Sequence, residues 1–446
     1  MNIPAGRFLI CGVLAVTVSS LLVGCSSEAT DYADRDSAEC AAFQAYPEAE
    51  GSTVTVYGSI RDTEADLLEQ GWAQFTRCTR IAVEYEGNGE FEAQLRVRVQ
   101  GGNPPDLALI PQPGLLADFA RQGKLKAAPA TTTTEANQNW SKEWINYGSV
   151  DGRFYAAPLG SNVKSFVWYS PGYFKEKGYP VPTTWAEMTD LSDRIAASGT
   201  LPWCAGIESG EATGWPATDW LEDVLLRTAG VDVYDQWVNH QIPFNDPQVI
   251  AAMERAGSIL RNDRYVNGGF GGVRSIATTA FQDAGRPILD RKCAMHRQAS
   301  FYSANWPDDV KVGPDQDVFA FYFPPIDASR GKPVLGAAEF TAAFEDRPEV
   351  QSFQTYLASA DFANRRAKLG SWVSANRGLD LANVPNPIDK LSVQTLQDPQ
   401  TVFRFDGSDV MPAAVGAGTF WKGMTDWING KDTKAVADYI EGSWPK

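Results

Sequence analysis

The stretch VDGRFYAAPLGSNVKSFVWY, Val150–Tyr169, decides how the chain is divided. After an Asp-Gly turn, Phe154–Ala157 is typical of a short strand. Pro158 removes a backbone donor and the run Gly160–Asn162 bends freely, so we expect the sheet to end there. Ser165–Tyr169 then begins a second β-prone run. The pattern predicts that the chain leaves one α/β lobe and enters another; the alternative is a β-loop-β unit within a single sheet.

Residues 1–24 have the features of a secretion signal and are excluded from the fold. Arg7 precedes the apolar run Phe8–Val18, and Leu22-Val23-Gly24 stands directly before Cys25. This end resembles a bacterial lipoprotein signal, in which the cysteine receives the lipid. A simple membrane anchor is the alternative, but so short an apolar run would span a bilayer poorly. No later stretch is long and apolar enough to cross a membrane.

Residues 25–50 are expected to hold the lipidated cysteine and a tether, because residues 26–36 are small and polar. About 400 residues remain, which is too many for one hydrophobic core and suits two lobes. Removing Arg7 with the signal changes the formal charge from −16 to −17. A surface this acidic argues against nucleic acid or anionic lipid as a partner.

Four cysteines remain besides Cys11 and Cys25, and an even number outside the cytoplasm favours disulfides. Three pairings are possible in principle. Two of these cysteines precede the crossover and two follow it, so either mixed pairing would join the lobes and prevent opening. We therefore predict the pairs Cys40–Cys78 and Cys204–Cys293. A zinc site is disfavoured because no two of these cysteines are close in sequence and the chain has only two histidines.

Strands and helices alternate in the first lobe. The expected elements are strands at 52–58, 81–85 and 106–110 and helices at 64–77 and 92–100. This order predicts a largely parallel sheet covered on both faces. Ligands of such sheets lie beyond the carboxyl ends of the strands, which makes Ser59, Asn88 and Gln112 candidate binding residues.

Several motifs together carry a resemblance to a known family. The lipoprotein signal is followed by the β-α-β start, PPDLALIPQPGLL at 104–116, YAAP and VWYSP around the crossover, and TTWAEM at 183–188. In this order they resemble extracellular solute-binding lipoproteins of carbohydrate ABC importers (family 1), particularly the maltose-, trehalose- and α-glucoside-binding branch. The resemblance implies a two-lobed, periplasmic-binding-protein-like α/β fold with a hinge and an interlobe ligand cleft. We expect lobe 1 at 51–158 and 325–365, and lobe 2 at 159–324 and 366–446.

Three tryptophans are candidates for stacking on a sugar, because a pyranose presents a flat apolar face. Trp215 lies in a loop before a helix whose apolar positions do not need it, and the family has a Trp-Pro at this place. Trp372 lies in a second loop. Maltose-binding proteins have a Met-Pro, a short loop and a Phe-Trp; here the loop between Met411-Pro412 and Phe420-Trp421 is one residue longer. The offset leaves open whether Trp421 or Phe420 stacks on the ligand.

Polar residues complete the expected site. The further candidates are Asn162, Lys164, Glu208, Arg297, Glu339, Phe340 and Arg377. Glu339 stands in a run of small residues, and a carboxylate can accept hydrogen bonds from two neighbouring sugar hydroxyls. We expect Lys164 or Arg377 to face Glu339 and to lower the pKa of its carboxyl group. A core role is the alternative for Trp215, and a turn carboxylate is the alternative for Glu339.

The resemblance implies a receptor that captures a mono- or oligosaccharide between two closing lobes and delivers it to a membrane permease without breaking bonds, and we expect an α-glucoside. It implies no cofactor and no metal, a lipid-anchored monomer at the extracytoplasmic face of the bacterial membrane, and no nucleic-acid partner. A surface glycosidase is one alternative; it needs two carboxylates across the scissile bond, for which Glu339 and Glu208 are the candidates. A receptor for a non-sugar solute is the other. The sequence does not determine the sugar, its length or its linkage.

Overall fold

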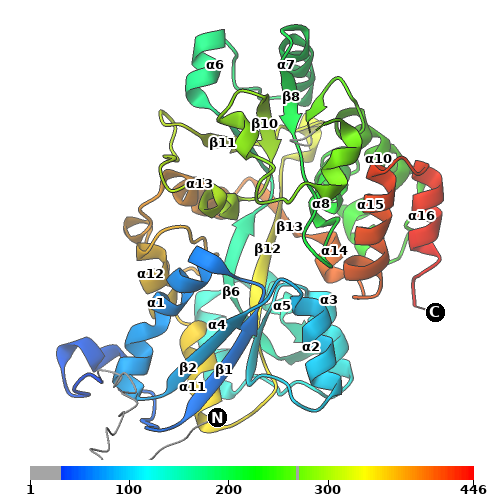
Figure 1. The fold of residues 1–446 in the computed structure, drawn as a ribbon. Helices are drawn as coiled ribbons and strands as arrows, with labels where there is room; N and C mark the ends of the chain where they lie inside the picture. Colours follow the sequence, from blue (N-terminus) through cyan, green and yellow to red (C-terminus); the bar gives the residue numbers. More distant parts are fainter. Residues whose placement is uncertain (1–31, 268–270, 446) are drawn as a thin grey trace, which may run out of the picture.

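The computed structural model describes residues 32–267 and 271–445. The expected signal peptide, Cys25 and the first residues of the tether therefore lie outside the described residues. Figure 1 shows two lobes, one above the other, with long strands running between them. Among the described residues, no helix combines the length and the apolar character needed to cross a membrane.

The first lobe is built on a six-stranded mixed sheet. Its strands lie in the order β13 (Thr401–Phe405), β12 (Lys332–Ala343), β3 (Leu107–Ile110), β1 (Thr53–Gly58) and β2 (Ala82–Gly87), and β6 (Ala156–Val163) also pairs with β12. β1 pairs in parallel with β2 and β3, as the alternation of strands and helices predicts, whereas β12 runs antiparallel to β3.

All four side chains of β3 are buried, because helices cover both faces of this sheet. Leu107 and Leu109 belong to the core on one face, and Ala108 and Ile110 to the core on the other. The helices of this lobe are α1 (Asp62–Thr79), α2 (Phe91–Gln100), α3 (Pro113–Arg121), α4 (Ala130–Asn139), α5 (Lys142–Tyr147), α11 (Pro348–Leu357) and α12 (Ala360–Lys368). A small hairpin, β4 (Ser149–Val150) and β5 (Arg153–Phe154), precedes β6.

The second lobe has a five-stranded sheet in the order β11 (Phe319–Tyr322), β7 (Phe166–Tyr169), β10 (Cys293–Arg297), β8 (Leu201–Cys204) and β9 (Val266–Asn267). Its helices are α6 (Pro171–Lys177), α7 (Trp185–Ala197), α8 (Trp215–Thr228), α9 (Val231–Val238), α10 (Pro247–Leu260), α15 (Trp421–Ile428) and α16 (Thr433–Glu441). Two further helices, α13 (Pro387–Gln397) and α14 (Gly407–Val410), lie near the junction of the lobes. The predicted two-lobed α/β fold is confirmed.

The crossover strand β6 continues through Pro158 and Gly160, so the expected end of the sheet at this point was wrong. Its only strand partner is β12 among the described residues, and a proline is tolerated where one side of a strand is unpaired. β6 and β12 together connect the lobes. Residues 401–405 pair with β12 in the first sheet, although the expected boundary assigned them to lobe 2.

Both predicted disulfides are confirmed, and each lies within one lobe. Cys40 is bonded to Cys78 with the Cα atoms 5.4 Å apart, and Cys204 to Cys293 with the Cα atoms 5.6 Å apart. Cys204 and Cys293 belong to the neighbouring strands β8 and β10. Neither bond joins the two lobes, so neither restricts a movement of one lobe against the other.

Candidate functional site

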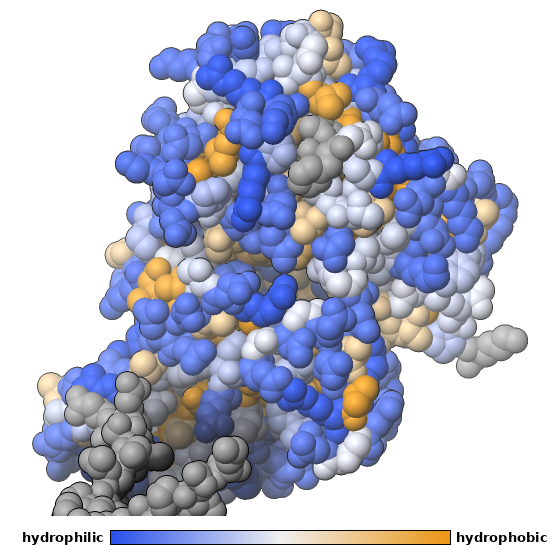
Figure 2. All heavy atoms as spheres, viewed as in Figure 1, coloured by the Kyte–Doolittle hydropathy of each residue, from blue (hydrophilic) through white to orange (hydrophobic). Residues whose placement is uncertain are grey.

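A cavity of about 240 Å³ lies between the lobes. The space-filling view shows the surface hollowed in this region (Figure 2). Lobe 1 contributes residues that follow the carboxyl ends of β1, β2 and β3: Ser59, Ile60, Arg61, Glu64, Gly89, Glu92, Pro111 and Gln112. Lobe 2 contributes Ser209, Ala212, Trp215, Phe281, Ser300, Phe301, Asp409 and Trp421. The connecting strands and the segments beside them supply Gly160, Ser161, Asn162, Lys164, Ala337, Glu339, Ser371, Trp372, Val373 and Asp389.

Glu339 reaches the cavity on the face of β12 that also presents Ala337, two residues earlier, to the cavity. The pairing of β12 with β6 shifts between Ala338 and Phe340, where Leu159 and Gly160 of β6 both stand opposite Glu339. The neighbouring Phe340 packs into the core of lobe 1 beside Phe405, with ring centroids 5.9 Å apart.

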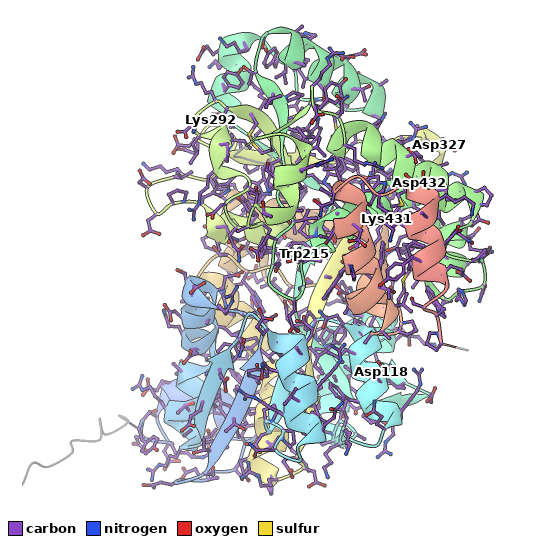
Figure 3. The ribbon with its side chains drawn as sticks, turned by 45° about the vertical axis from the view of Figure 1, so that its right-hand side comes forward. Asp118, Trp215, Lys292, Asp327, Lys431 and Asp432 are labelled. Atoms are coloured by element: carbon purple, nitrogen blue, oxygen red, sulfur yellow. A yellow bond between two sulfur atoms is a disulfide. The ribbon has the colours of Figure 1, made fainter. Side chains whose placement is uncertain are left out.

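Trp215 is one of four aromatic residues in the lobe 2 wall, together with Phe281, Phe301 and Trp421. It lies between the lobes in Figure 3, at the start of α8. Its ring meets Phe281 edge to face, with centroids 5.0 Å apart, and is tilted against Phe301 at 6.0 Å. The amine of Lys164 lies 5.1 Å from its ring centroid. These contacts orient a large apolar surface that borders the cavity.

Trp372 stands against the crossover strand and is supported from behind by lobe 1. The guanidinium of Arg366 lies 4.8 Å from its ring centroid, and Phe362 meets the ring edge to face at 6.1 Å. A Cβ added to Gly160 would be only 2.4 Å from the indole, so the strand can approach the ring this closely only with a glycine. Trp372 is therefore held in one position at the cavity wall.

The structure separates Phe420 from Trp421. Phe420 is fully buried in the lobe 2 core against Trp237 and Phe244. Trp421 borders the cavity, and its Nε1 donates to Ser408 Oγ at 3.3 Å. Of the two, the tryptophan is therefore the residue placed to touch a ligand.

Four buried polar atoms of lining residues find no hydrogen-bond partner within the described part of the chain. They are Gln112 Oε1, Ser161 Oγ, Asn162 Oδ1 and Trp372 Nε1. The amide nitrogen of Gln112 is used, because it donates to Glu92 Oε1 at 2.8 Å. Two amide acceptors, a hydroxyl and an indole donor of lining residues are thus without a partner in the described part of the chain, although each atom is itself buried. Hydroxyl groups can both donate to and accept from such atoms.

Lys164 borders the cavity but is committed to carboxylates behind it. Its amine bonds Asp219 Oδ1 at 2.9 Å and also Asp406 Oδ2. Burial alone would lower its pKa, but these two carboxylates outweigh burial and raise it well above the usual range. Asp219 and Asp406 form a buried carboxylate group with Glu222 that could in principle hold a metal ion, but the lysine ammonium already neutralises two of its members.

The pKa of Glu339 differs from the expectation. Burial raises it to about 7, and the hydrogen bond from its own backbone and the charge of Lys164 offset this only in part. Glu64 behaves in the same way: burial and the nearby charge of Glu339 raise its pKa to about 7 against the effect of Arg366. The expected net lowering of this pKa was wrong: the charge of Lys164 does lower it, but burial outweighs that effect, and Arg377 lies elsewhere.

Eight of the thirteen expected binding residues line the cavity; the structure places the others away from it. Asn88 accepts a hydrogen bond from Glu90 N at 2.8 Å, and Glu208 accepts one from Gly210 N at 2.8 Å. Both side chains thus accept hydrogen bonds from backbone N–H groups of their own loops. Because Glu208 does not line the cavity, the structure does not bring together the carboxylate pair that the glycosidase alternative needed.

The remaining misplaced candidates have structural partners. Arg297 is fully buried beneath the site, where it bonds Asp223 Oδ2 at 2.8 Å. Arg377 points to the chain of lobe 1 and donates to Trp140 O at 2.7 Å. Phe340 lies in the lobe 1 core. Their residue types matched a sugar site, but Arg297 pairs with a buried carboxylate, the exposed Arg377 bonds backbone carbonyl groups, and the alternation along β12 turns Phe340 into the core.

Sequence reasoning missed several lining residues, notably Glu64 and the aromatic pair Phe281 and Phe301. Glu64 lies in the first turn of α1, just after the carboxyl end of β1, which is a position that could have identified it. No comparable signal marks Phe281 and Phe301, since only the packing of their two loops brings them against Trp215.

Comparison with known proteins agrees with this arrangement. Residues 58–362 match the model of the bacterial extracellular solute-binding protein family. The chain is 43% identical to the osmoprotective compounds-binding protein GgtB of Synechocystis sp., over 88% of this chain and 92% of that protein. It is 37% identical to the alpha-glucosides-binding periplasmic protein AglE of Rhizobium meliloti, over 88% of this chain and 87% of that protein.

Among solved structures, the bacterial solute receptor AcbH superposes with a TM-score of 0.74 at 21% identity, covering 88% of this chain and 98% of that one. This likeness concerns the fold, which is the same two-lobed architecture. The match of sequence, fold and cavity leads to one assignment. The chain belongs to the bacterial extracellular solute-binding protein family.

Proposed function

We propose that this protein is the substrate-binding component of an ABC importer for sugars, and that its ligand is an α-glucoside or a related small glycoside. The lobes close on the ligand, and the closed form is delivered to the membrane permease. Two relatives named for osmoprotective compounds and for alpha-glucosides support this class of ligand. Binding shifts an open–closed equilibrium by the preference of the ligand for the closed cavity.

The chemistry of the cavity carries the proposal. Three tryptophans, Trp215, Trp372 and Trp421, border the cavity, and four lining residues, one of them Trp372, each carry a buried polar atom that has no partner among the described residues. An apolar ring face together with hydroxyls is what a pyranose presents, so a sugar would satisfy both features at once. A metal ion would need oxygen or nitrogen ligands around one point and would leave the aromatic surface unused.

The signal segment bears on where in the cell the protein is found. We propose that the chain is cleaved before Cys25, lipid-anchored at the extracytoplasmic face of the membrane, and monomeric. The motif Leu22-Val23-Gly24-Cys25 and the polar residues after it support this proposal. The permease is the expected protein partner.

A panel of neutral mono- and oligosaccharides tests the function. We expect thermal unfolding to shift upward with α-glucosides such as maltose, trehalose, sucrose or methyl α-glucopyranoside, because a ligand that binds only the folded state stabilises it by mass action. Isothermal titration calorimetry then measures the affinity. The same screen with peptides, polyamines and divalent cations covers the alternative of a non-sugar receptor. A response to one of those and to no sugar would refute the proposal.

A further inference from the structure

The cavity is rich in carboxyl groups. Its ionisable lining consists of Glu64, Glu92, Glu339, Asp389 and Asp409 against two cations, Arg61 and Lys164. Burial is the largest cause in raising the pKa of all five carboxyl groups. Each is thus in surroundings that disfavour negative charge.

Two of these carboxyl groups already have hydrogen-bond partners, and the charge of a lysine acts on a third. Glu92 accepts from Gln112, Asp389 accepts from Asn386 Nδ2 at 3.0 Å, and Asp409 lies beside the buried pair of Lys164 and Asp406. Glu64 and Glu339 are different: within residues 32–267 and 271–445 neither has an ion-pair partner. Both residues line the same cavity. They are close enough to each other for the charge of Glu339 to raise the pKa of Glu64.

The two lining cations cannot offset this excess. The amine of Lys164 is 2.9 Å from Asp219 and bonds Asp406 as well, so its charge is used behind the cavity wall. Arg61 is exposed at the rim, where solvent screens its charge. Arg366 acts on Glu64 from behind Trp372 and does not line the cavity. Among the described residues, the interior of the cavity therefore holds carboxyl groups without an ion-pair partner and no cation that is left to pair with them.

We propose that the cavity is a charge filter, which admits neutral glycosides and rejects glycosides that carry an anionic group such as a uronate or a phosphate. This inference rests on the proposed function. A ligand carboxylate placed beside Glu64 and Glu339 would be a third acidic group in a space shielded from water, where like charges repel one another strongly. A neutral sugar instead supplies hydroxyl donors to the same oxygens.

The test compares ligands that differ in charge but hardly in shape. Maltose and methyl α-glucopyranoside are each compared with derivatives whose non-reducing CH₂OH is replaced by a carboxylate or by a carboxamide. Calorimetry at pH 8 should give a dissociation constant at least about 100-fold weaker for the uronate than for the uronamide. At pH 6 this ratio should be smaller, because Glu64 and Glu339, with pKa values of about 7, then carry less charge.

Variants assign the effect to the two carboxyl groups. Glu64→Gln and Glu339→Gln should each reduce the uronate-to-uronamide ratio by about tenfold. The control Glu254→Gln removes the same charge from the exposed face of α10 and should leave the ratio unchanged. Equal affinities of uronate and uronamide, whether both bind or both fail, would overturn the charge filter alone. Failure of both neutral parent glycosides to bind would instead count against the proposed function.

Discussion

Gly160→Ala tests whether the position of Trp372 sets ligand affinity. The added Cβ would lie 2.4 Å from Trp372 Cη2 and 2.8 Å from its Cζ2 and Cζ3. Ordinary carbon contacts need about 3.5 Å or more, so the indole must move by roughly 1 Å. Arg366 and Phe362 block its retreat, so part of the strain remains. We expect a loss of about 1–3 kcal/mol in the free energy of unfolding, which is typical of an overpacked site.

The displaced ring should also weaken sugar binding by about tenfold, because the indole face then no longer lies where the ligand would stack on it. The indole Nε1, which has no partner among the described residues, moves with the ring. Calorimetry with the sugar that binds most tightly measures this loss, and urea unfolding measures the stability. Gly172→Ala is the matched control, since a Cβ there meets nothing within 4 Å. It should leave the affinity unchanged.

A double-mutant cycle separates the ring movement from direct obstruction by the new methyl group. In a Trp372→Ala background there is no indole to displace, so adding Gly160→Ala should change affinity and stability little. Persistence of the full affinity loss in that background would mean that the methyl group itself meets the ligand. Wild-type affinity in Gly160→Ala alone would refute the view that Trp372 contacts the sugar.

The other predictions concern the site, the chemistry, the pH dependence and the anchor. Trp215→Ala and Trp372→Ala should each weaken sugar binding by about 1–3 kcal/mol without unfolding the protein, and calorimetry with circular dichroism checks both. Incubation with bound oligosaccharide should yield no smaller sugars by chromatography; steady release abolished by Glu339→Gln would establish a glycosidase. The free energy of unfolding should fall as the pH rises from about 4.5 to 7, because Glu64 and Glu339 have raised pKa values and the folded state therefore binds more protons than the unfolded state in this range. Denaturant unfolding at a series of pH values measures this fall, which should be shallower in Glu339→Gln. Cys25→Ala should move the protein from the membrane fraction to the soluble fraction on immunoblots, and unchanged retention would exclude lipidation at this residue.

The raised pKa of Glu339 bears on the enzyme question. The expectation of a lowered pKa was an argument against a catalytic acid, since an acid needs a carboxyl group that stays protonated. With a pKa of about 7 this argument no longer holds. What opposes catalysis is the membership of a family of binding proteins, together with the absence of Glu208 from the cavity lining. The product assay is therefore the decisive measurement.

Local patterns in the sequence were enough to predict the elements of the first lobe. The helix expected at 64–77 spans Asp62–Thr79, and the one expected at 92–100 spans Phe91–Gln100. Hydrophobic spacing and glycine or proline boundaries are properties of neighbouring residues, so they are readable without the fold. The same holds for Ser59 and Gln112, which line the cavity because they directly follow parallel strands.

Partners that come from distant parts of the chain were decided only by the tertiary structure. Lys164 was expected to face Glu339, but it bonds Asp219 and Asp406, which follow it by 55 and 242 residues. Arg297 is likewise paired with Asp223 outside the cavity, whereas Arg377 is exposed and donates to a backbone carbonyl of lobe 1. A buried charge takes the partner that best offsets its loss of water, and that choice depends on which carboxylates the whole fold buries beside it. For this reason residue type predicted what a sugar site needs, while packing decided which tryptophans and carboxyl groups are left to provide it.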